Sequence, residues 1–279
     1  MFCETGFSKK ETQVIKVGKA TREEREVERM AEIRHVKRAA IEAMMKETQP
    51  GFYQAEMLPG AMEGVETYKC RLLKGAGCKL ESYKKKGVSL FFIGGNGQVF
   101  QGDVSFEITE RAVFCPDING VDYRIQAESD MEFLLLIQAM SQEDLKHYEM
   151  YHIVLPWFNT AKQWHLYTEG FRNEDLKSFA CLHQYYVSRM SLGEVVGPGN
   201  AKLEPHKHPE LFQWFYGLPG TDPFLFHAGD ETVDVEEGDW ICIPNETYHI
   251  VSPKKDKDYV DYVWFEVVVP GLEMCPYFY

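Results

Sequence analysis

The spacing of turn residues constrains this chain more than any other feature of its sequence. Between about residues 66 and 140, and again between about 180 and 270, apolar segments of mostly four to six residues alternate with turns rich in Gly, Asn and Asp, such as 94–97 and 117–120. Segments of this length, rich in Phe, Val and Ile, are typical of β-strands. The pattern predicts an all-β chain with two consecutive β units, each a sandwich or barrel.

The same pattern predicts the individual strands. The first unit is expected to contain strands at 89–93, 98–100, 104–108, 112–115, 123–125 and 133–137. The second is expected to contain strands at 182–190, 212–216, 224–227, 232–235, 240–243, 249–251 and 259–269.

A different pattern near the N-terminus predicts one long α-helix, from about Thr21 to Thr48. Thr21 and Glu24 have the spacing of a capping box, in which both side chains accept hydrogen bonds from amides of the first turn. Pro50 and Gly51 then end the helix. Its modest apolar stripe favours packing on a neighbouring domain or subunit, with a role at a membrane surface as the alternative. A long capped helix is also suited to hold a second copy, so we expect a homodimer.

The charge balance excludes two classes of partner. Thirty Lys and Arg against 43 Asp and Glu give a net charge of −13, which repels nucleic-acid backbones and anionic membranes. The sequence contains no apolar signal segment and no apolar stretch of about 18 residues. Its seven cysteines form no Cys-x-x-Cys pair, a pattern typical of a reducing compartment. We expect a cytoplasmic protein with no nucleic-acid and no membrane partner.

Three histidines carry the strongest chemical signal. His206 and His208 stand two residues apart, so on a strand both imidazoles project from one face. Two neutral imidazoles on one face form half of a site for a divalent first-row metal. About 40 residues later, the stretch 238–249 reads as turn, strand and turn, and His249 opens the returning strand. A barrel would bring His249 beside the first pair.

The two stretches around these histidines resemble the two signature motifs of the cupin superfamily. His206 and His208 match the paired histidines of the first motif, and Gly238, Pro244 and His249 match the second at its expected spacing. The resemblance extends over roughly residues 180–270. It implies two cupin-type barrels of the jelly-roll kind, the second of which binds one divalent metal ion: Mn, Fe, Ni or Zn.

The resemblance also implies a fourth ligand. Gln213 stands where the family motif has a glutamate, and some cupin enzymes bind their metal through three histidines and a glutamine. An amide oxygen can ligate a metal but adds no negative charge, so the ion would be more Lewis acidic. Two alternatives are a water molecule and Glu210, which lies beyond the bend at Pro209. A barrel with an empty pocket is the alternative to any metal.

Other positions depart from the motifs. Asn200 replaces the first glycine, Glu246 replaces a later one, and Pro253 replaces the final asparagine.

The first β unit has no comparable site, because no histidine occurs between His35 and His147. The predicted organisation is therefore an N-terminal helical extension at 1–60, a degenerate cupin barrel without metal ligands at 61–140, a connection at 141–178 with a short helix near 141–148, and a metal-binding cupin barrel at 179–279.

Five aromatic side chains near the predicted metal are candidates for a substrate pocket, although residues of this kind also form barrel cores. They are Tyr216, Phe226, Trp240, Tyr248 and Trp264.

Two further side chains are candidates for moving a proton. Glu266 lies inside a strongly apolar strand, where desolvation of a carboxylate suits a general base. It shares a face with Trp264, so it either meets the pocket or, if that face points outward, lies at an edge. His227 is the second candidate, with a hydrogen-bonded structural histidine as the alternative. Arg189 is a candidate anchor for an anionic substrate.

Small barrels enclose cavities of ligand size, so the expected partner is a small-molecule substrate. The sequence favours a metal-dependent enzyme acting on a small oxygenated or carboxylated molecule. The reaction would be an isomerase or lyase reaction through a stabilised enolate, or a dioxygenase reaction at Fe(II). The alternative is a non-catalytic protein that binds a small ligand, because a fold does not settle function.

Overall fold

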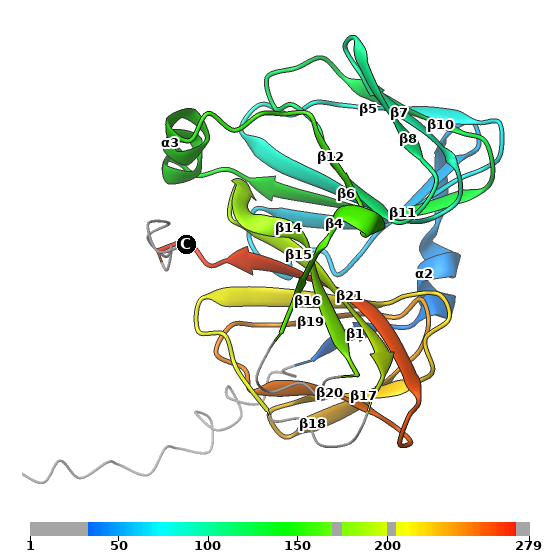
Figure 1. Cartoon of the computed structure of the whole chain (residues 1–279), viewed down its shortest axis with the longest axis vertical. Coiled ribbons are helices and arrows are strands. Elements are labelled where there is room, and N and C mark those ends of the chain that lie inside the picture. The colour runs from blue at the N-terminus through cyan, green and yellow to red at the C-terminus, as the bar shows by residue number, and fades with distance from the viewer. Residues whose placement is uncertain (1–32, 169–174, 200–204, 272–279) are drawn as a thin grey trace, which may run out of the picture. The chain divides into compact units, whose positions relative to one another are not determined.

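The computed structural model describes residues 33–168, 175–199 and 205–271, and these residues form two β units (Figure 1). The strands of the first unit are β2 (Lys46–Gln49), β3 (Phe52–Glu56), β4 (Val65–Leu72), β5 (Gly77–Leu80), β6 (Lys86–Gly94), β7 (Gly97–Gln101), β8 (Val104–Ile108), β9 (Ala112–Cys115), β10 (Tyr123–Ala127), β11 (Met131–Ala139) and β12 (Trp157–Thr160). They form a seven-stranded sheet in the order β12-β9-β6-β11-β4-β3-β2 and a four-stranded sheet in the order β5-β10-β7-β8. Side chains from both sheets fill one core.

The second unit repeats this plan. Its strands are β1 (Arg34–Val36), β13 (His165–Tyr167), β14 (Lys177–Val187), β15 (Met190–Pro198), β16 (Leu211–Gly217), β17 (Phe224–Ala228), β18 (Glu231–Val235), β19 (Trp240–Ile243), β20 (His249–Pro253) and β21 (Tyr259–Val268). A seven-stranded sheet in the order β1-β19-β16-β21-β15-β14-β13 faces a three-stranded sheet in the order β18-β17-β20. Phe215, Phe224 and Phe226 lie in the core between the two sheets.

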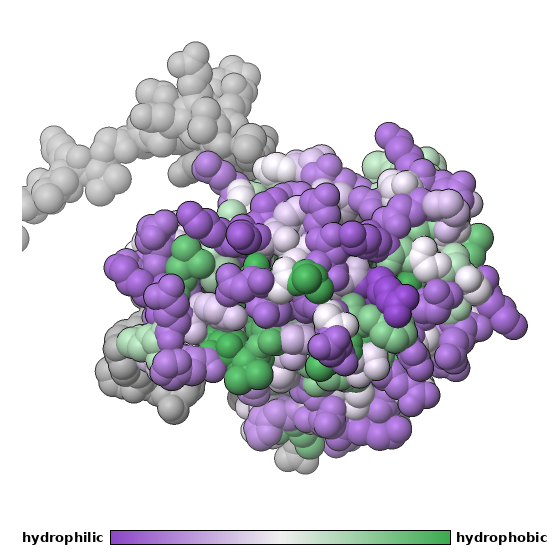
Figure 2. Space-filling model, turned by 90° about the horizontal axis from the view of Figure 1, so that it is seen from above, coloured by the Kyte–Doolittle hydropathy of each residue, from purple (hydrophilic) through white to green (hydrophobic). Residues whose placement is uncertain are grey.

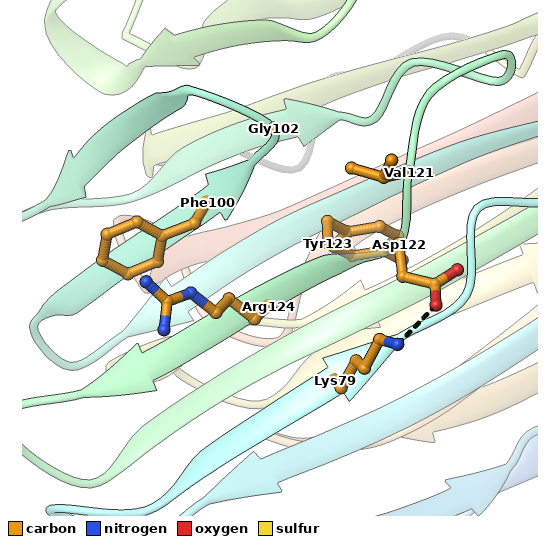
Figure 3. A pocket seen from close by; sticks show the side chains of 7 residues that line it. All are labelled: Lys79, Phe100, Gly102, Val121, Asp122, Tyr123 and Arg124. Atoms are coloured by element: carbon orange, nitrogen blue, oxygen red, sulfur yellow. Dashed lines mark ion pairs between the residues drawn. The ribbon is translucent and has the colours of Figure 1, made fainter.

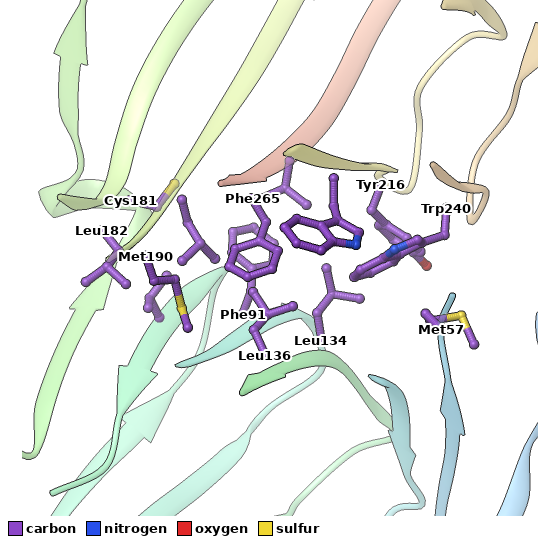
Figure 4. Close-up of a cluster of buried hydrophobic side chains, with 14 of the residues drawn as sticks. Met57, Phe91, Leu134, Leu136, Cys181, Leu182, Met190, Tyr216, Trp240 and Phe265 are labelled. Carbon is purple, nitrogen blue, oxygen red and sulfur yellow. The ribbon is translucent and has the colours of Figure 1, made fainter. Parts of the chain in front are cut away.

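A third apolar cluster joins the two units. Phe91, Leu134 and Leu136 of the first seven-stranded sheet pack with Trp240 and Phe265 of the second (Figure 4). Successive side chains of a strand point to opposite faces, so each of these sheets buries one face in its own unit and the other in this interface. Burial on both faces explains why 133–137 is apolar throughout instead of alternating with polar residues.

Most of the predicted strands are confirmed, but the segment 182–190 is not a single strand. It contains the end of β14, a turn, and the start of β15. Ser188 occupies the turn with a φ of 62°, and both Ser188 and Arg189 are buried. The turn escapes sequence analysis because its residues are neither Gly nor Asn and lie between apolar neighbours.

The long helix predicted over about 21–48 is wrong for the part that the structure describes. Residues 33–48 contain only the short helix α2 (Arg38–Met44), between strands β1 and β2; residues 21–32 lie outside the described residues. Strand β1 pairs with β19 and β2 pairs with β3, so hydrogen bonds to distant strands outweigh local helix propensity. The homodimer expected from a long helix stays a prediction.

The sheets also shift the predicted domain boundaries. The first sheet takes in β2 and β3, from the predicted extension at 1–60, and β12, from the predicted connection at 141–178. The second sheet takes in β1 and β13 in the same way. The short helix expected near 141–148 is present as α3 (Gln142–Met150), and a 3-10 turn covers Ala161–Gln163.

Among the described residues no helix is long and apolar enough to cross a membrane. Figure 2 shows mainly hydrophilic side chains on the face seen from above, with hydrophobic ones in small separate groups. The cysteines of the described ranges are free and buried, and they are Cys70, Cys78, Cys115, Cys181 and Cys242. Burial raises the pKa of both Cys78 and Cys242 to about 12, so these thiols stay protonated at neutral pH.

One buried carboxylate, Asp239, fastens the N-terminal strand to the second unit. It accepts hydrogen bonds from His35 Nε2 (3.1 Å), Lys37 Nζ (2.9 Å) and the Arg38 and Glu236 amides (2.9 and 3.0 Å). Burial alone would raise the pKa of Asp239, but these hydrogen bonds outweigh it and lower the pKa to about 2.

We predict that Asp239→Asn lowers the free energy of unfolding by about 1–3 kcal/mol at pH 7. Because folding depresses the pKa of Asp239, its contribution is complete above the unfolded value of about 3.9 and is lost as the pH falls toward about 2. Urea unfolding at pH 7 and pH 3 should therefore show that the free energies of unfolding of the wild type and Asp239→Asn differ less at pH 3.

Asp234→Asn is the matched control, because Asp234 is exposed and pairs with Lys254 at 2.7 Å. We expect this substitution to lower the free energy of unfolding by less than about 1 kcal/mol. Equal losses in the two variants would contradict the assigned role of Asp239.

Candidate metal centre

Three histidine side chains meet at the edge of the core of the second unit. His206, His208 and His249 each offer a ring nitrogen, and these nitrogens lie within 4.8 Å of one another. Their ring centroids are separated by 5.1 Å (206–208), 4.4 Å (206–249) and 5.7 Å (208–249). Within the three described ranges no other group of three His, Cys, Asp or Glu side chains is so placed. The structure thus brings together the three residues that the sequence spacing singled out.

Backbone pairing and side-chain packing hold this cluster. The His206 and His249 backbones exchange two hydrogen bonds, of 3.1 and 2.8 Å. The His249 Nδ1 lies 3.1 Å from the Thr247 carbonyl oxygen, which can only accept, so Nδ1 carries the proton and Nε2 keeps its lone pair. The rings of Phe215 and Phe226 lie 5.7 and 6.0 Å from the His249 ring. Three clustered imidazoles, one of them fixed in a ligating tautomer, fit a divalent first-row ion.

Gln213 lies on the inward face of β16, two residues before Phe215, and directly opposite Glu266 of β21. It is buried. Its Nε2 donates a hydrogen bond of 2.7 Å to Glu266 Oε1. Since the amide nitrogen is used in this way, the amide oxygen is the remaining atom through which Gln213 can ligate a cation.

Glu266 lies on the inward face of β21. Its neighbour two residues earlier, Trp264, packs against the core of the second unit, and its other oxygen, Oε2, accepts a hydrogen bond of 3.3 Å from Ser191 Oγ. Of the two orientations that the sequence left open for Glu266, the structure has the inward one. Ser191 was missed because the strand predicted at 182–190 ends one residue before it.

The predicted pocket residues do not lie together. Tyr216 and Trp240 are on the opposite face of the sheet, in the interface between the two units, so their assignment to the pocket is corrected. Phe226 is a core residue stacked on His249, and Tyr248 is exposed beside Lys207. Only Trp264 of the five lines a large groove, described below. Successive side chains of a strand point to opposite faces, and both faces of this sheet are buried and carry aromatic residues. The sequence therefore does not show which aromatic residues face the histidines.

Two further assignments are corrected. His227 alternates with Phe226 on β17 and so points away from the core; its Nδ1 lies 2.9 Å from Thr232 Oγ1, at an exposed position. Arg189 is buried and ion-paired with Asp144 at 3.0 Å, so its charge is already compensated. Neither residue reaches the histidine cluster.

The first unit carries a pocket of about 270 Å³ on its outer surface (Figure 3). Lys79 Nζ pairs with Asp122 at 2.7 Å, and the Arg124 guanidinium lies 4.2 Å from the centre of the Phe100 ring. The cations of this pocket are therefore engaged with neighbouring side chains, and nothing in it resembles the histidine cluster.

Comparison with known proteins supports the cupin interpretation. The family model described as "Cupin domain" matches residues 194–266, which include His206, His208, Gln213, His249 and Glu266. No curated protein matches the sequence.

Among solved structures, the fold is similar to that of a protein described as glyoxylate-induced from Pseudomonas aeruginosa, with 13% identity, 88% of this chain and 91% of that chain covered, and a TM-score of 0.68. It is also similar to an oxalate decarboxylase of Lactobacillus farciminis in complex with formate (14% identity, 84% and 86% covered, TM-score 0.61). A third similar structure is a cupin 2 conserved barrel domain protein from Leptotrichia buccalis, with 13% identity, 85% of this chain and 96% of that chain covered, and a TM-score of 0.56. These similarities confirm the all-β cupin fold predicted from the sequence.

The contact between Gln213 and Glu266 generates a charge-swap prediction. Gln213→Glu sets two carboxylates opposite each other and should lower the free energy of unfolding of the metal-free protein by about 1–3 kcal/mol at pH 8. The double variant Gln213→Glu/Glu266→Gln restores one charge and one amide, and should recover stability to within about 1 kcal/mol of the wild type. Urea unfolding in EDTA measures both effects. Additive losses in the double variant would show that the two side chains do not interact.

Proposed function

We propose that this cupin protein is a metal-dependent enzyme that acts on a small oxygenated or carboxylated molecule. The observation that carries the proposal is the convergence of His206, His208 and His249 at one site. A carboxylate, Glu266, also faces into the second unit and accepts a hydrogen bond from Gln213, the residue that we propose as fourth ligand.

In this proposal the three histidines hold one divalent ion, and Gln213 is the fourth ligand through Oε1. All four ligands are neutral, so a bound ion would keep its full charge and act as a Lewis acid toward an oxygen of the substrate. The donation from Gln213 Nε2 to Glu266 keeps the amide from rotating, which orients its oxygen.

Glu266 is the group that we assign to proton transfer. Its carboxylate accepts hydrogen bonds from Gln213 and from Ser191, which fix its orientation before a substrate binds. A proton taken from the substrate would reside on Oε2, the oxygen that faces Ser191. Isomerase or lyase chemistry uses such a base directly. Dioxygenase chemistry instead requires Fe(II) with open positions for substrate and O₂.

The similarity to an oxalate decarboxylase supports a carboxylated substrate only as a fold-level analogy, because the identity is 14%.

Elemental analysis of untagged protein tests the proposal. Protein stripped with EDTA is incubated anaerobically with Mn²⁺, Fe²⁺, Ni²⁺ or Zn²⁺ and then desalted. We expect about one ion per chain in the wild type and loss of at least about 90% of it in His206→Ala/His208→Ala, because two of the three imidazoles are gone. The retained ion indicates the reaction class: iron favours a dioxygenase, and the others favour an isomerase or lyase.

His165→Ala/His183→Ala is the matched control. It removes a different pair of histidines, whose ring centroids lie 6.3 Å from each other, and should leave the metal content unchanged. If the wild type retains no metal after reconstitution, the proposal is overturned and a non-catalytic barrel that binds a small ligand is favoured. Equal metal content in the wild type and the His206/His208 variant would place the ion elsewhere and overturn the assigned site.

A further inference from the structure

A groove of about 1040 Å³ lies along the second unit. Its lining includes the segment 151–154, which follows α3, and residues of β13 and β14. Ser191 of β15 and Trp264 of β21 complete the lining. Gly193 makes room for the Trp264 ring, because a Cβ on Gly193 would lie 2.1 Å from that ring.

Two lining residues of the groove lead toward the candidate metal centre. The Ser191 hydroxyl, which lines the groove, donates to Glu266, and Glu266 accepts from Gln213 on its other oxygen. Trp264 is paired with Phe215, whose ring contacts His249. The sheet order β16-β21-β15-β14 therefore runs from Gln213 and Phe215, past Glu266, into the groove.

The lining of the groove is mainly apolar. Aromatic and aliphatic side chains, including Tyr186 and Trp264, make up most of it; the polar groups are histidines, Gln184, Ser191 and the tyrosine hydroxyls. No Lys, Arg, Asp or Glu occurs among the described lining residues. A carboxylate or ammonium group placed there would lose water without gaining a counterion.

The size of the groove also constrains the ligand. A volume of 1040 Å³ lies at the upper end of the range for drug-sized ligands, about 300–1,000 Å³. An acid of two or three carbons would leave most of it filled with water. Aromatic walls favour a flat ring, which they can contact by stacking or edge-to-face packing.

We infer that this groove binds the part of the substrate remote from the metal, and that this part is uncharged and contains an aromatic or comparably flat apolar ring. The inference rests on the proposed function for the reacting end of the molecule, and it narrows the substrate class to ring-bearing compounds whose body carries no charge. The oxygen that reacts lies at the Glu266 end of the groove.

A matched pair of probes tests the inference. The probes are 2-naphthol, which is neutral at pH 7, and 2-naphthoate, which has the same ring system with a carboxylate. Isothermal titration of the EDTA-stripped full chain should show binding of 2-naphthol at least about tenfold tighter than binding of 2-naphthoate, because the described lining offers no Lys or Arg to the carboxylate.

Gln184→Lys adds a cation to the groove, and Gln98→Lys is its control. Both glutamines are partly buried, and Gln98 lies on β7 of the first unit, away from the groove. Gln184→Lys should reduce the preference for 2-naphthol by at least about fivefold, whereas Gln98→Lys should leave it unchanged. Circular dichroism confirms that both variants are folded.

The metal-free assay separates this inference from the proposed function. The same preference in His206→Ala/His208→Ala would place the probes in the groove, independently of the metal site. Four results would each overturn the inference. The wild type could fail to bind 2-naphthol, or could bind 2-naphthoate more tightly. The preference for 2-naphthol could be lost in His206→Ala/His208→Ala, or Gln184→Lys and Gln98→Lys could change that preference equally. None of these results would change the metal content that tests the proposed function.

Discussion

The packing of two seven-stranded sheets through their outward faces is the constraint on which the rest of this structure depends. Because Trp214, Tyr216 and Phe265 are committed to that interface, the residues that alternate with them must point into the second unit. Gln213 and Glu266 are two of these residues. A shift of one residue in the register of β16 or β21 would exchange the two sets and place the polar pair in an apolar interface. The interface therefore determines which side chains the candidate site can contain.

Two groups of charged side chains lie where the two units meet, and one of them joins the units. Arg111, in the turn between β8 and β9, reaches Glu194 and Asp261 on the second sheet. Burial raises the pKa of Glu194 to about 7, although the Arg111 charge opposes this. On the first sheet, buried Lys69 pairs with Glu132 and lies 5.2 Å from the centre of the Tyr216 ring. An unmatched charge at Arg111 would be costly, so its ion pairs favour one relative placement of the sheets.

Much of the fold and the centre of the site could be predicted from the sequence. The strand pattern and the spacing of His206, His208 and His249 are local, and both are found in the structure. The long N-terminal helix was wrong because the pairing of β1 with β19 is set by residues about 200 positions away. Tyr216 and Trp240 were misplaced because aromatic residues line both faces of β16 and β19, and the sequence does not show that a second sheet covers one face. The groove had no sequence signal, since it is assembled from the segment 151–154 and from four strands, β13, β14, β15 and β21.

The central claim is that the inward surface fixed by this interface carries a metal centre at the three histidines. Anomalous diffraction from crystals of the full chain reconstituted with Mn²⁺ tests it most directly. We expect one strong peak at bonding distance, about 2.0–2.3 Å, from a ring nitrogen of each of His206, His208 and His249, with the Gln213 amide oxygen turned toward it. A fully occupied ion bound elsewhere, with the three imidazoles unligated, would contradict the account.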